Sequence, residues 1–114
     1  MASVNYYMHI GIGDAKYAID PFYVSHVYRY PSKIIPYPGD KDVFIEMADM
    51  EQGSIPVVNG KFLGLSVDIE KKYLLVLEVK EKKFGIGCGE VFGIYKKIQE
   101  NTEIISPEEI LDRS

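Results

Sequence analysis

The sequence has a single cysteine, no tryptophan and no long apolar run. Its 114 residues include one cysteine, Cys88, which cannot form a disulfide within the chain. No stretch approaches the roughly 20 consecutive apolar residues that span a bilayer. The first residues also lack the basic start and apolar stretch of a signal peptide. These absences predict a cytoplasmic protein that does not insert into a membrane.

An excess of positive charge is missing too. The 13 Lys and Arg residues and 17 Asp and Glu residues give a net charge of 13 − 17 = −4. A mildly acidic chain repels phosphate backbones, so we predict no nucleic-acid partner. What the sequence does contain is 46% hydrophobic residues and nine tyrosines. That composition is typical of one globular domain rich in strand-favouring aromatics.

Short strand-like segments occupy the first half of the chain. Residues 7–12 end at Gly13-Asp14, and residues 16–19 return, which predicts a tight hairpin. Residues 23–30 have an apolar spacing that fits either a short strand or one helical turn. Farther along, β-branched residues 54–58 precede Asn59-Gly60, a strong two-residue turn signal, so a second hairpin is predicted there.

The second half has one strong strand pair and one helix. Residues 73–79 form an unbroken apolar run that predicts a strand buried on both faces, with a charged turn at 80–83 and a partner strand at 84–86. Ser106, with proline next and glutamate at the third helical position, predicts the start of a short C-terminal helix. The fold class is therefore mainly β, a small barrel or sandwich.

An internal repeat is also present. Residues 12–19 align without a gap over residues 79–86, an offset of 79 − 12 = 67, and the agreement runs over 18 positions, 12–29. At this offset the matched pairs include Val24 and Val91, Val27 and Ile94, and Tyr28 and Tyr95. The pattern predicts a duplicated supersecondary unit.

An ordered series of segments resembles the CheW-like family of chemotaxis coupling proteins, from about Tyr7 to Pro107. The series is Gly13–Ile19, Val24-x-x-Val27-x-Arg29, Ile34 or Ile35 with Pro36, Phe44-Ile45, Gly53–Val58, Tyr73–Leu77, Phe84–Ile86 and Val91. The resemblance implies two small SH3-like β-barrel lobes in one domain over residues 1–114. Lobe one would cover about residues 5–65 and lobe two about 70–114.

The same resemblance implies a function. Members of the family are adaptors without catalytic activity or cofactor, so we expect none here. They couple the cytoplasmic tip of a chemoreceptor to the regulatory domain of a CheA-type histidine kinase. We expect this chain to act in the same way.

Contact positions follow from the resemblance. The family's Gly-x-x-Asn-Leu-Arg-Gly segment falls on residues 47–53, where Gly53 is kept and Met50-Glu51-Gln52 replace Asn-Leu-Arg. His26 stands where the family has an exposed acidic residue. The expected protein-binding residues are Val24, His26, Val27, Tyr28, Gln52, Gly53, Tyr73, Leu74, Gly85 and Val91.

The two matched segments of the repeat allow two interpretations. Val24, Val27 and Tyr28, with Val91, Ile94 and Tyr95, would line a groove between the lobes, the site that receives the receptor tip in the family. Alternatively these side chains fill the two lobe cores, and for Val27 and Ile94 the core is the preferred interpretation.

The sequence departs from the family in length. After the Ile-x-Pro stretch the family continues with two more strands and a terminal helix, so this chain is interpreted as diverged and C-terminally shortened. A barrel without these strands exposes unpaired edges. We expect a homodimer partner, strand exchange or rearranged pairing to complete the second lobe, unless the hairpin at Asn59-Gly60 supplies local replacement strands.

Other functions stay open. A diverged member would self-associate or regulate another sensory complex. A small β-barrel ligand-binding protein or enzyme would use Cys88, His9 and His26, and it requires these three side chains to meet in one pocket. They do not have a zinc-ligand spacing, so no metal site is expected. The glycines at 85, 87 and 89 precede no helix signal and are interpreted as packing glycines.

Overall fold

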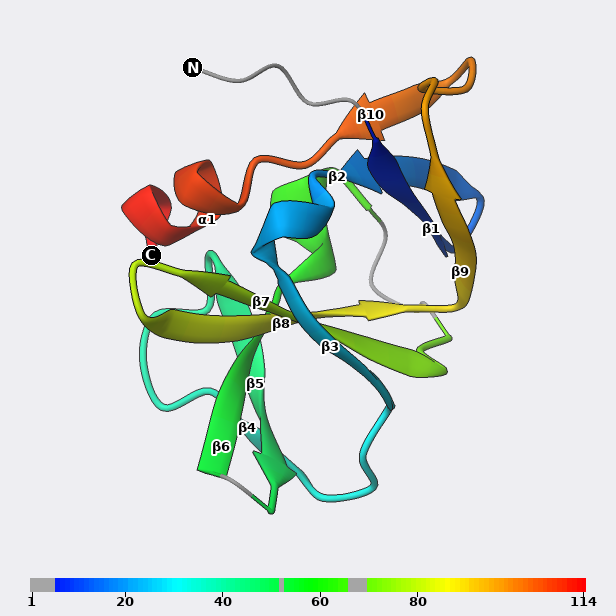
Figure 1. The fold of residues 1–114 in the computed structure, drawn as a ribbon. Coiled ribbons are helices and arrows are strands. Elements are labelled where there is room, and N and C mark those ends of the chain that lie inside the picture. The colour runs from blue at the N-terminus through cyan, green and yellow to red at the C-terminus, as the bar shows by residue number, and fades with distance from the viewer. Residues whose placement is uncertain (1–5, 52, 66–69) are drawn as a thin grey trace.

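The computed structural model of the chain describes residues 6–51, 53–65 and 70–114. Its strands form a four-stranded sheet in the order β10-β2-β1-β9 and a six-stranded sheet in the order β3-β7-β8-β6-β5-β4 (Figure 1). The predicted mainly β class is confirmed. The strands are β1 (Tyr7–Ile12), β2 (Ala15–Ile19), β3 (Val24–Arg29), β4 (Ile34–Pro36), β5 (Phe44–Met50), β6 (Gly53–Val58), β7 (Tyr73–Val79), β8 (Lys82–Cys88), β9 (Glu90–Tyr95) and β10 (Thr102–Ile104).

The helices are short. Two 3-10 helices, η1 (Pro21–Tyr23) and η2 (Gly60–Leu63), lie in loops, and α1 (Pro107–Arg113) follows β10. Ser106 caps α1 by accepting a hydrogen bond from the Glu109 amide, so the predicted C-terminal helix is confirmed. In the described ranges, no helix is long and apolar enough to cross a membrane.

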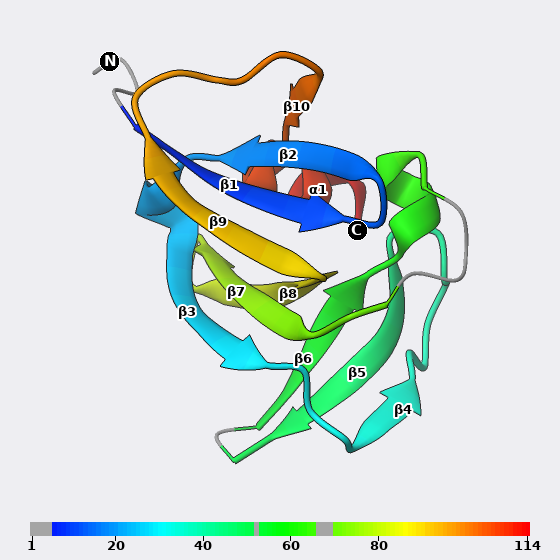
Figure 2. The same ribbon diagram turned by 90° about the vertical axis from the view of Figure 1, so that its right-hand side faces the viewer.

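The main hydrophobic core lies between the two sheets (Figure 2). Alternate residues of each strand supply it, because successive side chains of a strand point to opposite faces. From the four-stranded sheet come Ile10 and Ile19, and from the six-stranded sheet come Leu75, Leu77 and Phe84. On the other face of β7, Leu74 and Val76 are buried in a second, smaller cluster. The prediction that residues 73–79 are buried on both faces is therefore confirmed.

The two hairpins predicted at Gly13-Asp14 and at residues 80–83 are confirmed, as β1–β2 and β7–β8. In the second turn Lys80 and Glu81 both have positive φ, 50° and 68°. This is the conformation of a type I′ turn, which normally selects glycine or asparagine. The turn is formed here by two long charged residues, whose side chains lie exposed.

The predicted hairpin at Asn59-Gly60 is wrong. Asn59 has φ −69°, not the positive φ of a type I′ turn, and its side chain accepts a hydrogen bond from the Lys61 amide to cap η2. β6 instead pairs with β5 in antiparallel orientation and with β8 in parallel orientation. Capping by the asparagine side chain overrides the turn signal, and no replacement strands arise here.

The register of the strands reproduces the internal repeat. In β1–β2 the pair is His9 and Ala18, and in β7–β8 it is Val76 and Gly85, where 76 − 9 and 85 − 18 both equal 67. Residues 23–30 resolve into η1 and a strand, β3. A β-bulge interrupts β3 at Ser25 and the β1–β9 ladder at Phe92, again 67 residues apart. The repeat is thus a structural one, bulges included.

The third strand of each unit pairs with the first strand of the other unit. β3 lies beside β7, and β9 lies beside β1. Each sheet therefore combines strands from both halves of the sequence, so the sheets do not follow the lobe limits 5–65 and 70–114. The division into lobes, and the closure of each sheet into a barrel, stay predictions.

The second unit also has a shortened version of the next segment. β10 pairs with β2 in parallel orientation, as β6 pairs with β8. Ile104 pairs with Ala18, and Val57 pairs with Gly85. The two partners, Ala18 and Gly85, are again 67 residues apart. A capping residue follows two positions later in both cases, Ser106 and Asn59. Only residues 96–101 join β9 to β10, and in the described chain the four-stranded sheet has no counterpart of β4 or β5.

Candidate protein-interaction site

A cavity of about 350 Å³ opens at one side of the six-stranded sheet. Three of the predicted contact residues meet there: His26, Tyr28 and Gly53. Strand β3 contributes one wall and the β5–β6 hairpin the other. The full lining is Ser25, His26, Tyr28, Met50, Glu51, Gly53, Ser54, Ile55, Val76 and Lys83.

The bulge in β3 shapes the first wall. It falls at Ser25, so that Val24 and Val27 both pair with core-side residues of β7, while His26 and Tyr28 face the cavity. The rings of His26 and Tyr28 stack, with centroids 5.3 Å apart and planes at 20°. His26 Nδ1 lies 3.0 Å from Ser25 Oγ. The wall thus presents two stacked rings with polar atoms at the rim.

The second wall is the tip of the β5–β6 hairpin. Gly53 has φ +125°, a conformation that side chains rarely adopt, so glycine is required there by the backbone. Met50 and Glu51, which replace the family's Asn and Leu, line the cavity. Gln52 lies outside the described residues.

The floor of the cavity is apolar and well supported. Val76 belongs to the second hydrophobic cluster, against which Tyr28, Met50 and Ile55 also pack. Lys83 and Glu51 add opposite charges at the rim. An apolar floor with a polar, mixed-charge rim is the arrangement found at protein–protein contact sites.

The remaining predicted contact residues lie elsewhere. Val24 and Val91 are partly buried against the main core. Tyr73 is exposed at the start of β7. Leu74 is fully buried, and a side chain added at Gly85 would meet its Cδ1 atom at 2.5 Å, so glycine makes room for it. These last two residues support the sheet beneath the surface and do not face solvent.

The preferred interpretation of Val27 and Ile94 as core residues is wrong. Val27 is 42% exposed and Ile94 is 51% exposed. Both lie on edge strands, β3 and β9, each paired on one side only among the described strands. Apolar spacing predicted the face on which they lie but not how far the core extends along the strand.

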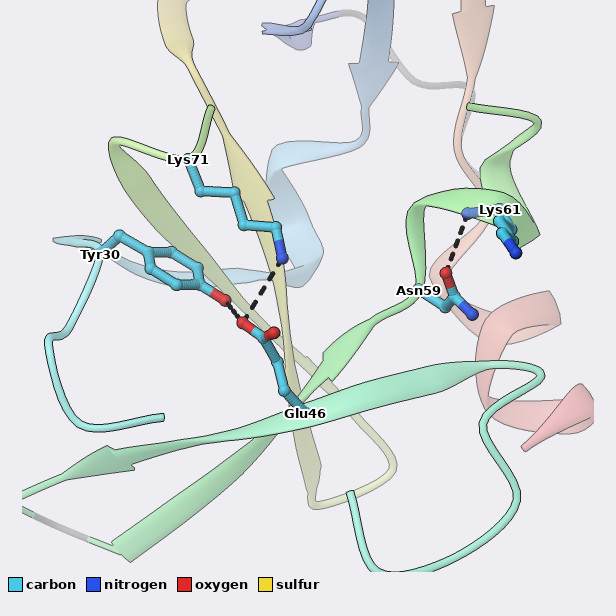
Figure 3. A network of polar contacts seen from close by, with 5 residues as sticks. All are labelled: Tyr30, Glu46, Asn59, Lys61 and Lys71. Atoms are coloured by element: carbon cyan, nitrogen blue, oxygen red, sulfur yellow. Dashed lines mark hydrogen bonds and ion pairs between the residues drawn. The ribbon is translucent and has the colours of Figure 1, made fainter. Parts of the chain in front are cut away.

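Sequence reasoning missed a polar network beside the second cluster, shown in Figure 3. The Tyr30 hydroxyl donates to Glu46 Oε2, and Lys71 Nζ lies 3.4 Å from the same oxygen. Lys71 Nζ also lies 5.4 Å from the centre of the Tyr30 ring. Burial, together with the hydrogen bond and charge of Glu46, raises the pKa of Tyr30 well above its ordinary value. The phenol therefore stays a hydrogen-bond donor.

This network joins residues from distant parts of the six-stranded sheet. Tyr30 follows β3 at one edge, while Glu46 is on β5 near the opposite edge, so the contact requires the sheet to curl. Gly87 leaves the space, because a side chain there would lie 2.7 Å from Lys71 Cδ and 3.1 Å from the Tyr30 ring. No local sequence motif could reveal this network, since Tyr30, Glu46 and Lys71 are far apart in the sequence.

The residues proposed for an enzyme do not meet. Cys88 is buried in the main core, and burial raises the pKa of its thiol to about 11, which disfavours the nucleophilic thiolate. His9 faces away from that core, edge-on to Tyr95 at 5.3 Å. His26 is exposed at the cavity on the other sheet. Within the described ranges, no cluster of three acidic, histidine or cysteine side chains is placed to hold a metal ion.

Fold and site together define a two-sheet β protein whose prominent surface feature is suited to protein contact. Comparison with known proteins agrees: the family model for the CheW-like domain matches residues 6–110. The chain therefore belongs to the CheW-like domain family, as the ordered series of segments predicted.

A solved structure shares the fold. The scaffolding protein TtCheW from Thermoanaerobacter tengcongensis superposes with a TM-score of 0.67 at 19% sequence identity. The match covers 89% of this chain and 66% of that one, so this chain spans just under two thirds of the length of TtCheW. A comparison with curated protein sequences gives no match.

Proposed function

We propose that this chain is a non-enzymatic cytoplasmic adaptor that couples chemoreceptors to a CheA-type histidine kinase. The observation that carries the proposal is the cavity shared by His26, Tyr28 and Gly53. These are positions at which the family resemblance expects partner contacts, and they come from two strands, β3 and β6. Membership of the CheW-like family supports the same role.

The cavity suits a protein partner that inserts an apolar side chain. Tyr28, Ile55 and Val76 offer apolar surface at the floor. Glu51 and Lys83 at the rim favour a partner that carries complementary charges around the inserted apolar side chain. Contacts of this kind concentrate binding energy in a few central residues, while rim charges govern specificity and the rate of association.

A second candidate is a diverged family member that binds itself or a different sensory complex. The observation in its favour is the replacement of Asn-Leu-Arg by Met50-Glu51-Gln52, which puts a carboxylate and a thioether on the cavity wall. A partner suited to the family's arginine would meet a different charge pattern here. This candidate uses the same cavity with a different occupant.

The test measures binding of the purified chain to the receptor cytoplasmic tip and to the kinase regulatory domain of the source cell. We expect Glu51→Lys to weaken binding about tenfold, because it reverses a rim charge. Glu100→Lys makes the same charge change on the β9–β10 linker and should leave binding unchanged.

One outcome would count against the adaptor, and another against the cavity as its contact site. If the chain binds neither partner and associates only with itself, the diverged candidate is favoured. If both partners bind but Glu51→Lys and Glu100→Lys behave alike, the adaptor stands and the cavity is not its contact site.

A further inference from the structure

Ile104 on β10 is far more exposed than its counterpart in the six-stranded sheet. It is 58% exposed, whereas Val57, which occupies the equivalent place on β6, is fully buried at 0%. The equivalence rests on pairing, since Ile104 pairs with Ala18 and Val57 with Gly85, 67 residues later. The difference therefore lies in what covers each strand.

β5 of the six-stranded sheet contributes to that cover, since its Ala48 lies in the same buried cluster as Val57, together with Leu74 and Val76 of β7. β5 pairs along the outer side of β6, with Glu46 opposite Val57 and Ala48 opposite Ile55. β10 occupies the matching position as the outermost strand of the four-stranded sheet, as Figures 1 and 2 show. In the described chain, no strand pairs with its outer side.

The backbone of β10 offers hydrogen-bonding groups on that outer side. The Ile105 amide donates to the Ala18 carbonyl at 2.9 Å. Residues of a strand alternate in the direction of their backbone groups, so the amide and carbonyl of Ile104 point away from β2. An edge with free groups beside an exposed isoleucine is a template for another strand.

We propose that the outer edge of β10 pairs in antiparallel orientation with β10 of a second copy of this chain, about a two-fold axis at Ile104. In this register the two Ile104 residues exchange both backbone hydrogen bonds, and their side chains cover each other. The four-stranded sheets of two copies then form one continuous sheet. Such an interface uses the same patch on both copies, as two-fold dimers do.

Charge favours this register over its neighbour. With the axis at Ile104, Glu103 lies opposite Ile105 of the second copy. With the axis at Glu103, the two carboxylates lie directly opposite each other, which is destabilising. β10 has only three residues, so the dimer is weak and forms at high concentration.

This interface is separate from the cavity. The cavity is lined by strands of the six-stranded sheet, β3 among them, whereas β10 belongs to the four-stranded one. The proposed dimer does not depend on the adaptor function, so an experiment that disproves one leaves the other standing.

Sedimentation equilibrium of the purified chain tests the proposal. We expect a monomer–dimer equilibrium in which Ile104→Lys raises the dissociation constant about tenfold or more, because two ammonium groups replace the apolar pair. Ile35→Lys is the matched control: Ile35 is 55% exposed on β4, the edge strand of the other sheet. It should leave the dissociation constant unchanged.

Amide hydrogen exchange on the unmodified chain gives a second readout. On raising the protein concentration, exchange of the Ile104 amide should slow, because it becomes bonded across the dimer. Exchange of the Ile105 amide, already bonded to Ala18, should change much less. A monomer at all concentrations up to about 1 mM, where even weak pairing is populated, would overturn the proposal. So would a dimer that responds equally to Ile104→Lys and Ile35→Lys.

Discussion

At the residue scale, Cys88 links burial to the dependence of stability on pH. Its thiol is fully buried in the main core, and burial raises its pKa from 9.0 to about 11. Below pH 9 the thiol is protonated in both the folded and the unfolded chain. Between pH 9 and 11 the unfolded chain loses this proton while the folded chain keeps it, so the free energy of unfolding falls as pH rises.

The expected slope from this one group is at most about 1.4 kcal/mol per pH unit. Cys88→Ala removes the titrating group, so its free energy of unfolding should fall less steeply between pH 9 and 11. At pH 7, where the thiol is protonated in both states, the variant should be less stable, because it leaves a small cavity. Urea unfolding at a series of pH values measures both effects. Parallel pH profiles for the two proteins would contradict this account.

The residues of the candidate site were predictable only in part. His26, Tyr28 and Gly53 were found because they stand at positions named by the family resemblance, and one cavity contains all three. The exposure of Val27 was not predictable, since it depends on the position of β3 at the edge of the assembled sheet. The bulge at Ser25 is also invisible in the sequence, although it decides which side chains of β3 face the cavity.

At the element scale, the capping residues Ser106 and Asn59 differ in the number of side-chain hydrogen bonds that they make. Ser106 makes one capping bond, to the Glu109 amide at 3.4 Å. Asn59 is buried, accepts from the Lys61 amide at 3.0 Å (Figure 3) and also donates from Nδ2 to the Lys41 carbonyl at 2.7 Å. Loss of Asn59 therefore breaks a cap and a link to a loop.

We expect Asn59→Ala to lower the free energy of unfolding by about 2 kcal/mol and Ser106→Ala by about 1 kcal/mol. Ser32→Ala, at an exposed serine in the β3–β4 loop, should have almost no effect. Chemical denaturation of the three variants measures the order. Equal losses for Asn59→Ala and Ser106→Ala would show that the bond to Lys41 contributes nothing.

The elements themselves followed from the sequence where local signals decided the outcome. Alternation and turn residues predicted β1–β2 and β7–β8, and capping signals predicted α1. Asn59-Gly60 failed because the same asparagine serves equally well as a turn residue and as a helix cap. β6 already lies between β8 and β5, so a strand that returned after Gly60 would have no side of β6 to pair with.

At the scale of the whole molecule, the exchanged strands join the two sheets into one unit. β3 of the first repeat unit pairs with β7 of the second unit, and β9 of the second unit pairs with β1 of the first. Both sheets also bury side chains in the same main core. Neither sheet can therefore lose its structure without removing strands or core contacts from the other.

We expect the chain to unfold in one cooperative transition. Hydrogen exchange tests this directly: the most protected amides of β1 and of β7, which lie in different sheets, should report the same free energy of opening. A difference of more than about 1 kcal/mol between the sheets would show that they open separately.

The reciprocal exchange of β3 and β9 has one further consequence. Each unit of two hairpin strands and a third strand supplies what the other lacks, in the same register and with the same bulge. Two short chains, each carrying one such unit, would make the same ladders by trading their third strands. The segment of residues 30–72 turns this intermolecular arrangement into an intramolecular one, so the molecule is organised as a dimer on a single polypeptide.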